Sequence, residues 1–298
     1  MTPSPDILCV GSVLWDVIGR SAAAMRQGSD VPGRITRGPG GVALNIAMAL
    51  ARFGLRPALL SAVGRDAEGD ELMTACAALG LDIGYVYRSN DLPTDVYMAI
   101  EGANGLIAAI ADAHSLEAAG DKILRPLLDG RLGSDPSPFA GTVALDGNLT
   151  HGLLEHIATA PALARADLRV APASPGKAER LRPFLIHPRA VLYMNLEEAG
   201  LLAQTRFDDS ASAAEALVKR GARRVLVTDG GRPASDAARD APTISYAPAA
   251  VLVTRVTGAG DTFMAAHVAA ELDGTPRAQA LTRALEAAAR YVSGETAP

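Results

Sequence analysis

One short stretch near the C-terminus combines bare backbone with a carboxylate. It consists of Gly258, Ala259, Gly260 and Asp261. The residues from Phe263 onward are good helix formers with apolar positions at helical spacing, so the stretch lies where a helix begins. Backbone N–H groups at a helix N-terminus bind anions, and glycine lets an anion approach closely. A phosphate could therefore bind the first three amides, while Asp261 accepts the proton of a hydroxyl group that attacks the phosphate.

Asp261 could be a general base or only part of the helix start. An Asp in the first turn of a helix is expected to have a lowered pKa, which argues against a general base. In phosphoryl transfer that objection is weak, because the hydroxyl becomes acidic only late and the carboxylate mainly orients it. The structural alternative is that Thr257 or Asp261 only caps the helix and the glycines form a tight turn. The four residues alone leave both interpretations open.

A second group of residues lies between 37 and 54. Gly40 and Gly41 precede a predicted helix, and Asn45 falls one turn into it among apolar residues. The group is not a dinucleotide-binding fingerprint, because Ala43 stands at the position of the third glycine. The alternative is that Asn45 only faces solvent, as most polar residues on helices do.

Asp16 follows the first predicted strand. Its two carboxylate oxygens could accept hydrogen bonds from two neighbouring hydroxyl groups of a sugar. The alternative is an ordinary surface Asp.

Asn195 and Glu198 lie at the end of another strand and in the first turn of the helix that follows. They could hold the water shell of Mg²⁺ between phosphates. The alternative is a capping box, in which each side chain bonds to the backbone of the other residue. His151 and His156 are five residues apart and do not share a helix face, so we interpret the five histidines as surface or packing residues.

The elements that must position these residues alternate along the chain. A strand at 7–12, a helix at 41–53, a strand at 57–62 and a helix at 68–79 indicate βαβ units and a mainly parallel sheet. Ligands of such sheets bind outside the carboxyl ends of the strands. Further strands are predicted at 142–147, 167–172, 190–195 and 223–231. The polar residues at strand ends include Asp16, Asp146, Asn195 and Thr228.

Two segments, 13–37 and 83–112, interrupt the alternation. The first is rich in glycine and small residues, and the second is typical of successive strands, DIGYVYRS, DVYMAIE and GLIAAIAD. We expect them to form a small β lid inserted in one domain that spans residues 1–298. Residues 129–141 have the composition of a surface loop.

Composition excludes several classes of protein. The chain has 298 residues, of which 49% are hydrophobic, enough for one large core. Its net charge is -5, and the sequence contains no run of basic residues. Both observations argue against nucleic acid as a partner. Cys9 and Cys76 are predicted in a strand and a helix, which suits reduced thiols in a cytoplasmic protein. No apolar run reaches the length of a membrane span, and the first residues do not read as a signal peptide.

Taken in chain order, these motifs resemble the PfkB, or ribokinase-like, family of carbohydrate and nucleoside kinases. The resemblance covers nearly the whole chain, and no motif is specific alone. The motifs are GSxxxD at 11–16, GGxxxN at 40–45, SAVGRDAEGD at 61–70, NxxE at 195–198, VTDGG at 227–231 and TGAGDTF at 257–263.

The resemblance implies a three-layer α/β/α domain with a β lid that closes over ATP-dependent transfer of the γ-phosphoryl group to a sugar hydroxyl. Asp261 would be the base, with the amides of 258–260 as the anion hole. Sugar hydroxyls would bind Asp16, Gly40, Gly41 and Asn45. Asn195 and Glu198 would bind Mg²⁺ and phosphate, with Mg²⁺ held through water. The nucleotide site would be lined by Asn195, Thr228 and Gly230.

The chain departs from the family pattern at two positions. Arg255 stands where many members have an Asp that contributes to a monovalent-cation site. Because a guanidinium cannot ligate K⁺ and carries a fixed charge, we expect activity without K⁺ dependence. Pro233 stands where the nucleotide-side loop of the family usually has another Gly, a departure next to the expected adenine contacts.

Within the family, the chain looks most like the pseudouridine kinases. The similarity lies in Thr94, Tyr97, Gly105 and Asp112 of the predicted lid and in the run VTGAGD. The best single substrate is therefore pseudouridine, which would become pseudouridine 5'-phosphate. Another sugar or nucleoside kinase and a non-catalytic ligand-binding protein of the same fold are the alternatives. An apolar lid edge would be a natural interface for a homodimer.

Overall fold

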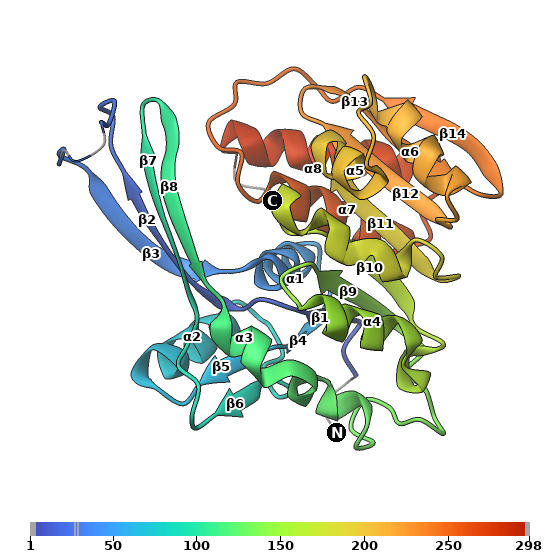
Figure 1. Cartoon of the computed structure of the whole chain (residues 1–298), viewed down its shortest axis with the longest axis horizontal. Coiled ribbons are helices and arrows are strands. Elements are labelled where there is room, and N and C mark those ends of the chain that lie inside the picture. Colours follow the sequence, from blue (N-terminus) through green and yellow to red (C-terminus); the bar gives the residue numbers. More distant parts are fainter. Residues whose placement is uncertain (1–3, 27, 29, 296–298) are drawn as a thin grey trace.

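The computed structural model describes residues 4–26, 28 and 30–295. It shows a large sheet between helices, with a smaller sheet that projects from one end (Figure 1). The two helices predicted early in the chain are α1 (Val42–Arg52) and α2 (Ala67–Ala78). Residues 129–141 form a loop whose only β pairing is an isolated bridge. Within the described ranges, no helix is long and apolar enough to cross a membrane.

The large sheet has eight strands in the order β14-β13-β12-β11-β10-β9-β1-β4. The strands from β12 to β4 in this order are parallel, and β13 and β14 form an antiparallel edge. The strands are β1 (Ile7–Val10), β4 (Pro57–Leu60), β9 (Thr142–Asp146), β10 (Asp167–Ala171), β11 (Ala190–Asn195), β12 (Arg224–Asp229), β13 (Arg232–Ala238) and β14 (Ala241–Tyr246).

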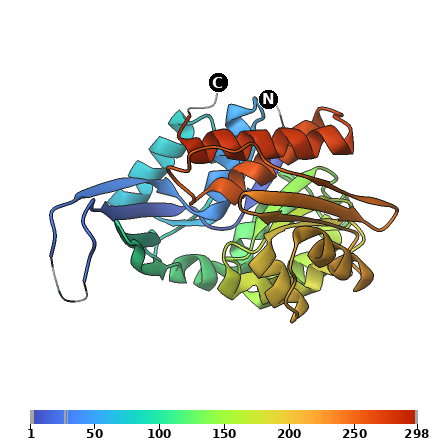
Figure 2. The ribbon, with the colours of Figure 1, turned by 90° about the horizontal axis from the view of Figure 1, so that it is seen from above.

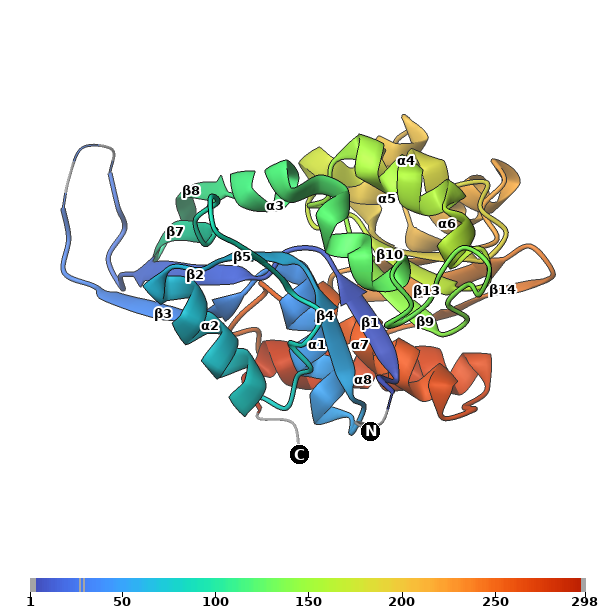
Figure 3. The ribbon, with the colours of Figure 1, turned by 90° about the horizontal axis from the view of Figure 1, so that it is seen from below.

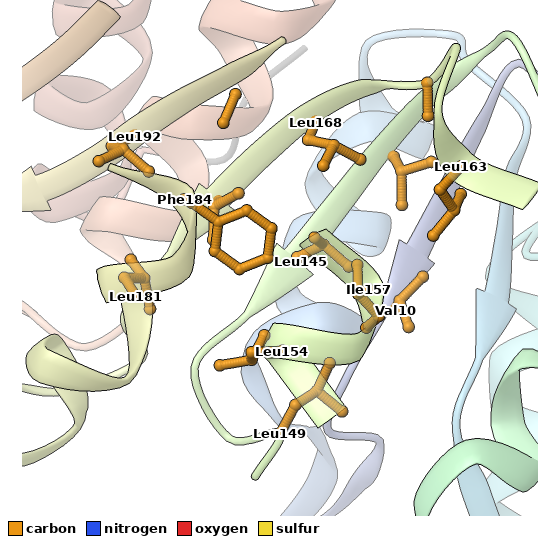
Figure 4. Packing of buried hydrophobic residues seen from close by; sticks show 14 of the residues in the cluster. Val10, Leu145, Leu149, Leu154, Ile157, Leu163, Leu168, Leu181, Phe184 and Leu192 are labelled. Atoms are coloured by element: carbon orange, nitrogen blue, oxygen red, sulfur yellow. The ribbon is translucent and has the colours of Figure 1, made fainter. Parts of the chain in front are cut away.

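Alternate residues of the strands face two separate hydrophobic cores. On β1, Ile7 and Cys9 pack with α1, α2, α7 (Ala259–Leu272) and α8 (Arg277–Ser293). Leu8 and Val10 face the opposite layer, part of which Figure 4 shows in close-up. That layer contains α3 (His114–Ala119), η1 (Gly120–Leu127), α4 (His151–Thr159), η2 (Pro161–Leu163), η3 (Pro175–Phe184), α5 (Leu196–Ala203) and α6 (Ser210–Lys219).

Figures 2 and 3 show the two helical layers on opposite faces of the sheet. The predicted three-layer α/β/α fold is therefore confirmed. Both cysteines are buried and free, Cys9 in β1 and Cys76 in α2.

The projecting sheet has four strands in the order β3-β2-β7-β8. They are β2 (Leu14–Arg20), β3 (Arg34–Gly40), β7 (Val96–Gly102) and β8 (Gly105–Asp112). Thus β2 and β3 come from the first irregular segment, of which residues 27 and 29 lie outside the described residues, and β7 and β8 come from the second. Whether the sheet closes as a lid stays a prediction.

The expectation that DIGYVYRS adds a strand beside DVYMAIE is wrong. Only Tyr87–Ser89 is a strand, β6, and it pairs with β5 (Ala62–Gly64) in a separate two-stranded sheet. Two hydrogen bonds to the segment around β5 explain this pairing. The Tyr87 amide donates to the Ser61 carbonyl at 2.9 Å, and the Arg88 guanidinium donates to the Gly64 carbonyl at 2.6 Å. These bonds hold β6 against the main body.

Candidate active site

The stretch GAGD forms the start of α7, as predicted. Gly258 is the N-cap in the left-handed conformation, with φ of 87°, and a Cβ there would lie 2.5 Å from the Tyr291 hydroxyl. Both constraints require glycine. No side chain caps the helix, so the alternative in which Thr257 or Asp261 serves only as a cap is not what the structure shows.

The amides at this helix start are not equivalent. The Ala259 amide donates to the Val256 carbonyl at 3.0 Å, whereas the amides of Gly258 and Gly260 donate to no described residue. The positive end of the helix dipole adds to these two free donors. The predicted anion hole therefore has two available amides in this structure, and its role stays a prediction.

Asp261 is partly buried and faces α1, which lies beside α7 (Figure 3). The Asn45 side-chain amide donates to Asp261 Oδ2 at 3.1 Å. Two residues 216 positions apart are thus brought into direct contact. The sequence assigned Asn45 to the sugar, and the structure places it next to the proposed base.

The expected lowering of the Asp261 pKa is wrong. Burial raises the pKa of Asp261 to about 7, against the lowering effect of the Asn45 hydrogen bond. The carboxylates of Asp146, Glu198 and Asp16 raise the pKa further by repulsion. Desolvation and like charges therefore outweigh the helix terminus, whose effect was the only one visible in the sequence. The raised pKa makes Asp261 a stronger base near neutral pH.

Asp16 lies on β2, where it pairs with Gly38 of β3 and Tyr97 of β7. A Cβ on Gly40 would lie 2.1 Å from Asp16 Cγ, so glycine at that position lets the carboxylate pack against the backbone. Burial raises the pKa of Asp16 to about 6. A Cβ on Gly41, whose φ is 96°, would lie 2.5 Å from the Ser12 carbonyl oxygen.

Asp146 has a role that the sequence did not reveal beyond its position at a strand end. It is fully buried, and its Oδ2 accepts hydrogen bonds from the Ser12 amide and hydroxyl, both at 2.8 Å, and from the Ala43 amide at 2.9 Å. A Cβ on Gly11 would lie 2.3 Å from Asp146 Cγ. Asp146 therefore joins β1, β9 and the start of α1, and so helps to position Asn45.

Lys177 is a cation near the same strand ends that sequence reasoning missed. It lies in η3 directly after β10, and its ammonium contacts Asn148 Oδ1. Burial lowers the pKa of Lys177. A lysine that follows a buried strand at its carboxyl end was the available signal.

Asn195 and Glu198 form a capping box at the start of α5, which confirms the structural alternative. Asn195 Oδ1 accepts from the Glu198 amide at 2.9 Å, and Glu198 Oε2 accepts from the Asn195 amide at 2.8 Å. Glu198 is 8% exposed, and burial raises its pKa. Glu198 Oε1 accepts no hydrogen bond from a described residue, and the expected role of Glu198 toward Mg²⁺ stays a prediction.

Thr228 pairs with Asn195 across parallel strands β12 and β11, so the two lie side by side. Gly230, with φ of 58°, begins the turn into β13. Pro233 lies in β13, where its carbonyl accepts from the Ser210 hydroxyl at 2.6 Å.

The histidines are surface or packing residues, as expected. His151 and His156 are exposed on α4, whereas His267 is fully buried and bonded to the Tyr193 hydroxyl at 2.9 Å. In the described part of the chain, no group of three or more His, Cys, Asp or Glu side chains could hold a metal ion. A metal at this site would need ligands from substrate and water as well.

Comparison with known proteins identifies the family of this chain. The family model for pfkB family carbohydrate kinases matches residues 4–297, so the chain belongs to this family. Its members are phosphotransferases that act on hydroxyl groups, and this chain is a sugar or nucleoside kinase of that family.

Two Escherichia coli (strain K12) proteins are among the relatives. The uncharacterized sugar kinase YeiI is 29% identical over 278 residues, which are 92% of this chain and 74% of YeiI. A pseudouridine kinase is 27% identical over 281 residues, which are 92% of this chain and 86% of that protein.

Solved structures show the same fold. The Arabidopsis thaliana ribokinase complexed with ribose and ATP has a TM-score of 0.79 at 20% identity, covering 99% of this chain and 95% of that one. A carbohydrate kinase from Agrobacterium tumefaciens has a TM-score of 0.78 at 26% identity, covering 96% and 90%.

Proposed function

We propose that this chain transfers the γ-phosphoryl group of ATP to a hydroxyl group of a sugar or nucleoside in an Mg²⁺-dependent reaction. The observation that carries the proposal is the contact of Asn45 with a partly buried Asp261 at the glycine-rich start of α7. It supports a base beside an anion site. A binding protein needs the anion site but not the base.

In the proposed reaction the substrate hydroxyl oxygen bonds to the γ-phosphorus, and the bond from that phosphorus to the bridging oxygen of ADP breaks. Asp261 takes the hydroxyl proton. The free amides of Gly258 and Gly260 would stabilise the negative charge of the transferred group. Asp16, Gly40, Gly41 and Asn45 are proposed to hold the sugar hydroxyls.

The nucleotide and metal would bind at the neighbouring strand ends. We assign Asn195, Thr228 and Gly230 to the nucleotide, supported by the pairing of β11 with β12. Glu198 Oε1 is a hard carboxylate oxygen without a described partner, so Glu198 and Asn195 fit Mg²⁺ held through water. Mg²⁺ would neutralise phosphate charge there.

The projecting sheet is proposed to act as the lid and to carry the substrate preference. Asp16 and Tyr97 are neighbours on it. Thr94 instead bonds to Asp66, its amide donating to Oδ2 at 2.7 Å, and Asp112 pairs with His114 at 2.8 Å. Of the lid residues that suggested pseudouridine, Tyr97 is therefore the one paired directly with a proposed sugar ligand.

Pseudouridine is the proposed substrate, supported by the lid motifs and by the 27% identical pseudouridine kinase. The test is ADP release with ATP and Mg²⁺ across pseudouridine, uridine, adenosine, ribose, fructose and 2-keto-3-deoxygluconate. Preference for pseudouridine would support the assignment. Turnover of another compound would support the proposed kinase activity and reject pseudouridine as the substrate. Turnover of ribose would favour the ribokinase-like alternative.

We also propose a homodimer and, from the two free buried cysteines, a cytoplasmic location. The non-catalytic alternative predicts no ADP release with any compound and ligand binding that does not depend on Asp261.

A further inference from the structure

One hollow of the structure, which we call the basic pocket, shares no residue with the candidate active site. It lies between β6 and η1 and has a volume of about 300 Å³. Its lining contains five cationic side chains and no carboxylate. The cations are Arg65, Arg88, Lys122, Arg125 and Arg131.

The charge in the basic pocket is only partly balanced. Arg88 pairs with Asp70 at 2.7 Å and Arg131 with Asp129 at 2.8 Å, both outside the lining. The other three, Arg65, Lys122 and Arg125, form no ion pair with a described residue. The chain as a whole has a net charge of -5, so three unpaired cations that line one hollow form a locally positive region.

Two tyrosines lie close to three of the five cations. The Tyr87 ring lies 5.6 Å from the Lys122 ammonium and 5.5 Å from the Arg125 guanidinium, and the Tyr85 ring lies 6.0 Å from that of Arg131. These are cation–π distances, so the rings favour cations on this side of the protein. Neither tyrosine hydroxyl bonds to a described residue, which leaves two further donors.

We propose that the basic pocket binds inorganic phosphate or a small phosphate monoester. Guanidinium groups and hydroxyl donors that line one hollow can match the oxygens of a phosphate. The volume lies at the lower end of the range for small-molecule sites, which leaves room for an organic group beyond the phosphate. A compact anion fits better than a nucleic acid, because the cations surround a hollow and do not extend as a stripe.

The test compares two double variants of the full chain by calorimetric titration. Arg65→Ala with Arg125→Ala removes two unpaired cations of the basic pocket. Arg189→Ala with Arg223→Ala is the matched control, since both of these arginines are exposed and line a different pocket. The ligands are inorganic phosphate, ribose 5-phosphate and AMP, which separate free phosphate, sugar phosphate and nucleotide.

At least one ligand should bind to both the natural chain and the control. Its affinity for the pocket variant should be at least tenfold lower. The single variant Arg125→Gln repeats the test if the double variant unfolds at a lower temperature than the control. Identical isotherms for all three proteins, equal weakening in the control, or no binding at millimolar ligand would overturn the proposal.

Discussion

At the scale of single residues, Asp261 is defined by its neighbours. Asn45 stabilises its ionised form, whereas burial and the Asp146, Glu198 and Asp16 carboxylates oppose ionisation. The balance gives a base that titrates near neutral pH. A bound phosphate would raise the pKa of Asp261 and a bound metal ion would lower it. The pKa of Asp261 should therefore be measured in the protein without ligands.

Replacing Asp261 with Asn should lower turnover by about 10²- to 10⁴-fold, the usual contribution of a general base, while ligand binding persists. ADP release and ligand titration measure the two effects. Asp273→Asn is the matched control, because Asp273 lies at the other end of α7 with an exposed side chain. Unchanged turnover in Asp261→Asn would contradict the assignment of the base.

The value of kcat/KM should rise with pH and show an inflection near pH 7. Asp261 must be ionised to accept a proton, and its pKa is about 7. Asn45→Ala removes the hydrogen bond that lowers this pKa, so the inflection should move to higher pH. Asn90→Ala, an exposed loop change, serves as control. A pH profile with the same inflection in Asn45→Ala would contradict the proposed coupling.

Arg255 supports the predicted independence from K⁺. Its guanidinium lies 3.9 Å from the Tyr291 ring, and its Nε donates to the Tyr291 carbonyl at 2.7 Å. A fixed positive charge therefore lies at the C-terminal end of α8, close in sequence to the anion site. Replacing K⁺ with tetramethylammonium should change kcat less than twofold, whereas a several-fold loss would reject this interpretation.

At the scale of elements, Asp236 links two strands to a helix. It is fully buried in β13, and it pairs with Arg224 of β12 at 2.6 Å and Arg277 of α8 at 2.8 Å. The arginines lower the pKa of Asp236 against the raising effect of burial. Removing the carboxylate would leave two partly buried cations without this partner.

Asp236→Ala should therefore lower the free energy of unfolding by about 3–5 kcal/mol, measured by chemical denaturation at pH 7. Asp129→Ala, which breaks the exposed pair with Arg131, should cost less than about 1 kcal/mol. Because the folded pKa of Asp236 is lowered, its stabilisation should be lost as the pH falls below the usual value of 3.8. An equal effect of both variants would show that the buried network adds no more stability than the exposed ion pair.

At the scale of the whole molecule, the two faces of the projecting sheet differ. Asp16 and Tyr97 lie on one face, and the alternate residues of the strands lie on the other. That second face exposes apolar side chains. These are Ile35, Met98, Ile100 and Ile110, which are 79%, 47%, 41% and 69% exposed. A second copy of the chain would cover an apolar face of this kind.

Sedimentation analysis should therefore give twice the chain mass of 30.7 kDa. Ile110→Lys should shift the protein toward the monomer, because it places a charge in the apolar face. Ile186→Lys is the control, since Ile186 is 76% exposed but lies away from that sheet, after η3. A monomer in the natural chain would contradict the proposed dimer.

Much of the fold could be predicted because buried parallel strands are short apolar runs that end in polar or turn residues. The helix at 41–53 is observed at 42–52, and the strand at 142–147 at 142–146. The strand predicted over DIGYVYRS, residues 82–89, is assigned to the wrong sheet, because alternation of apolar residues does not identify the partner strand. Tyr87 and Arg88 instead bond to the segment around β5.

By itself, the sequence determined the α/β class, the start of α7 and the residue types of the site, because propensity, glycine and strand-end chemistry act over a few positions. The tertiary structure alone decided that Asn45 bonds to Asp261 and that Asp146 joins β1, β9 and α1. It also reversed the expected shift of the Asp261 pKa. Burial and repulsion between carboxylates depend on distances across the fold, and local sequence does not contain those distances.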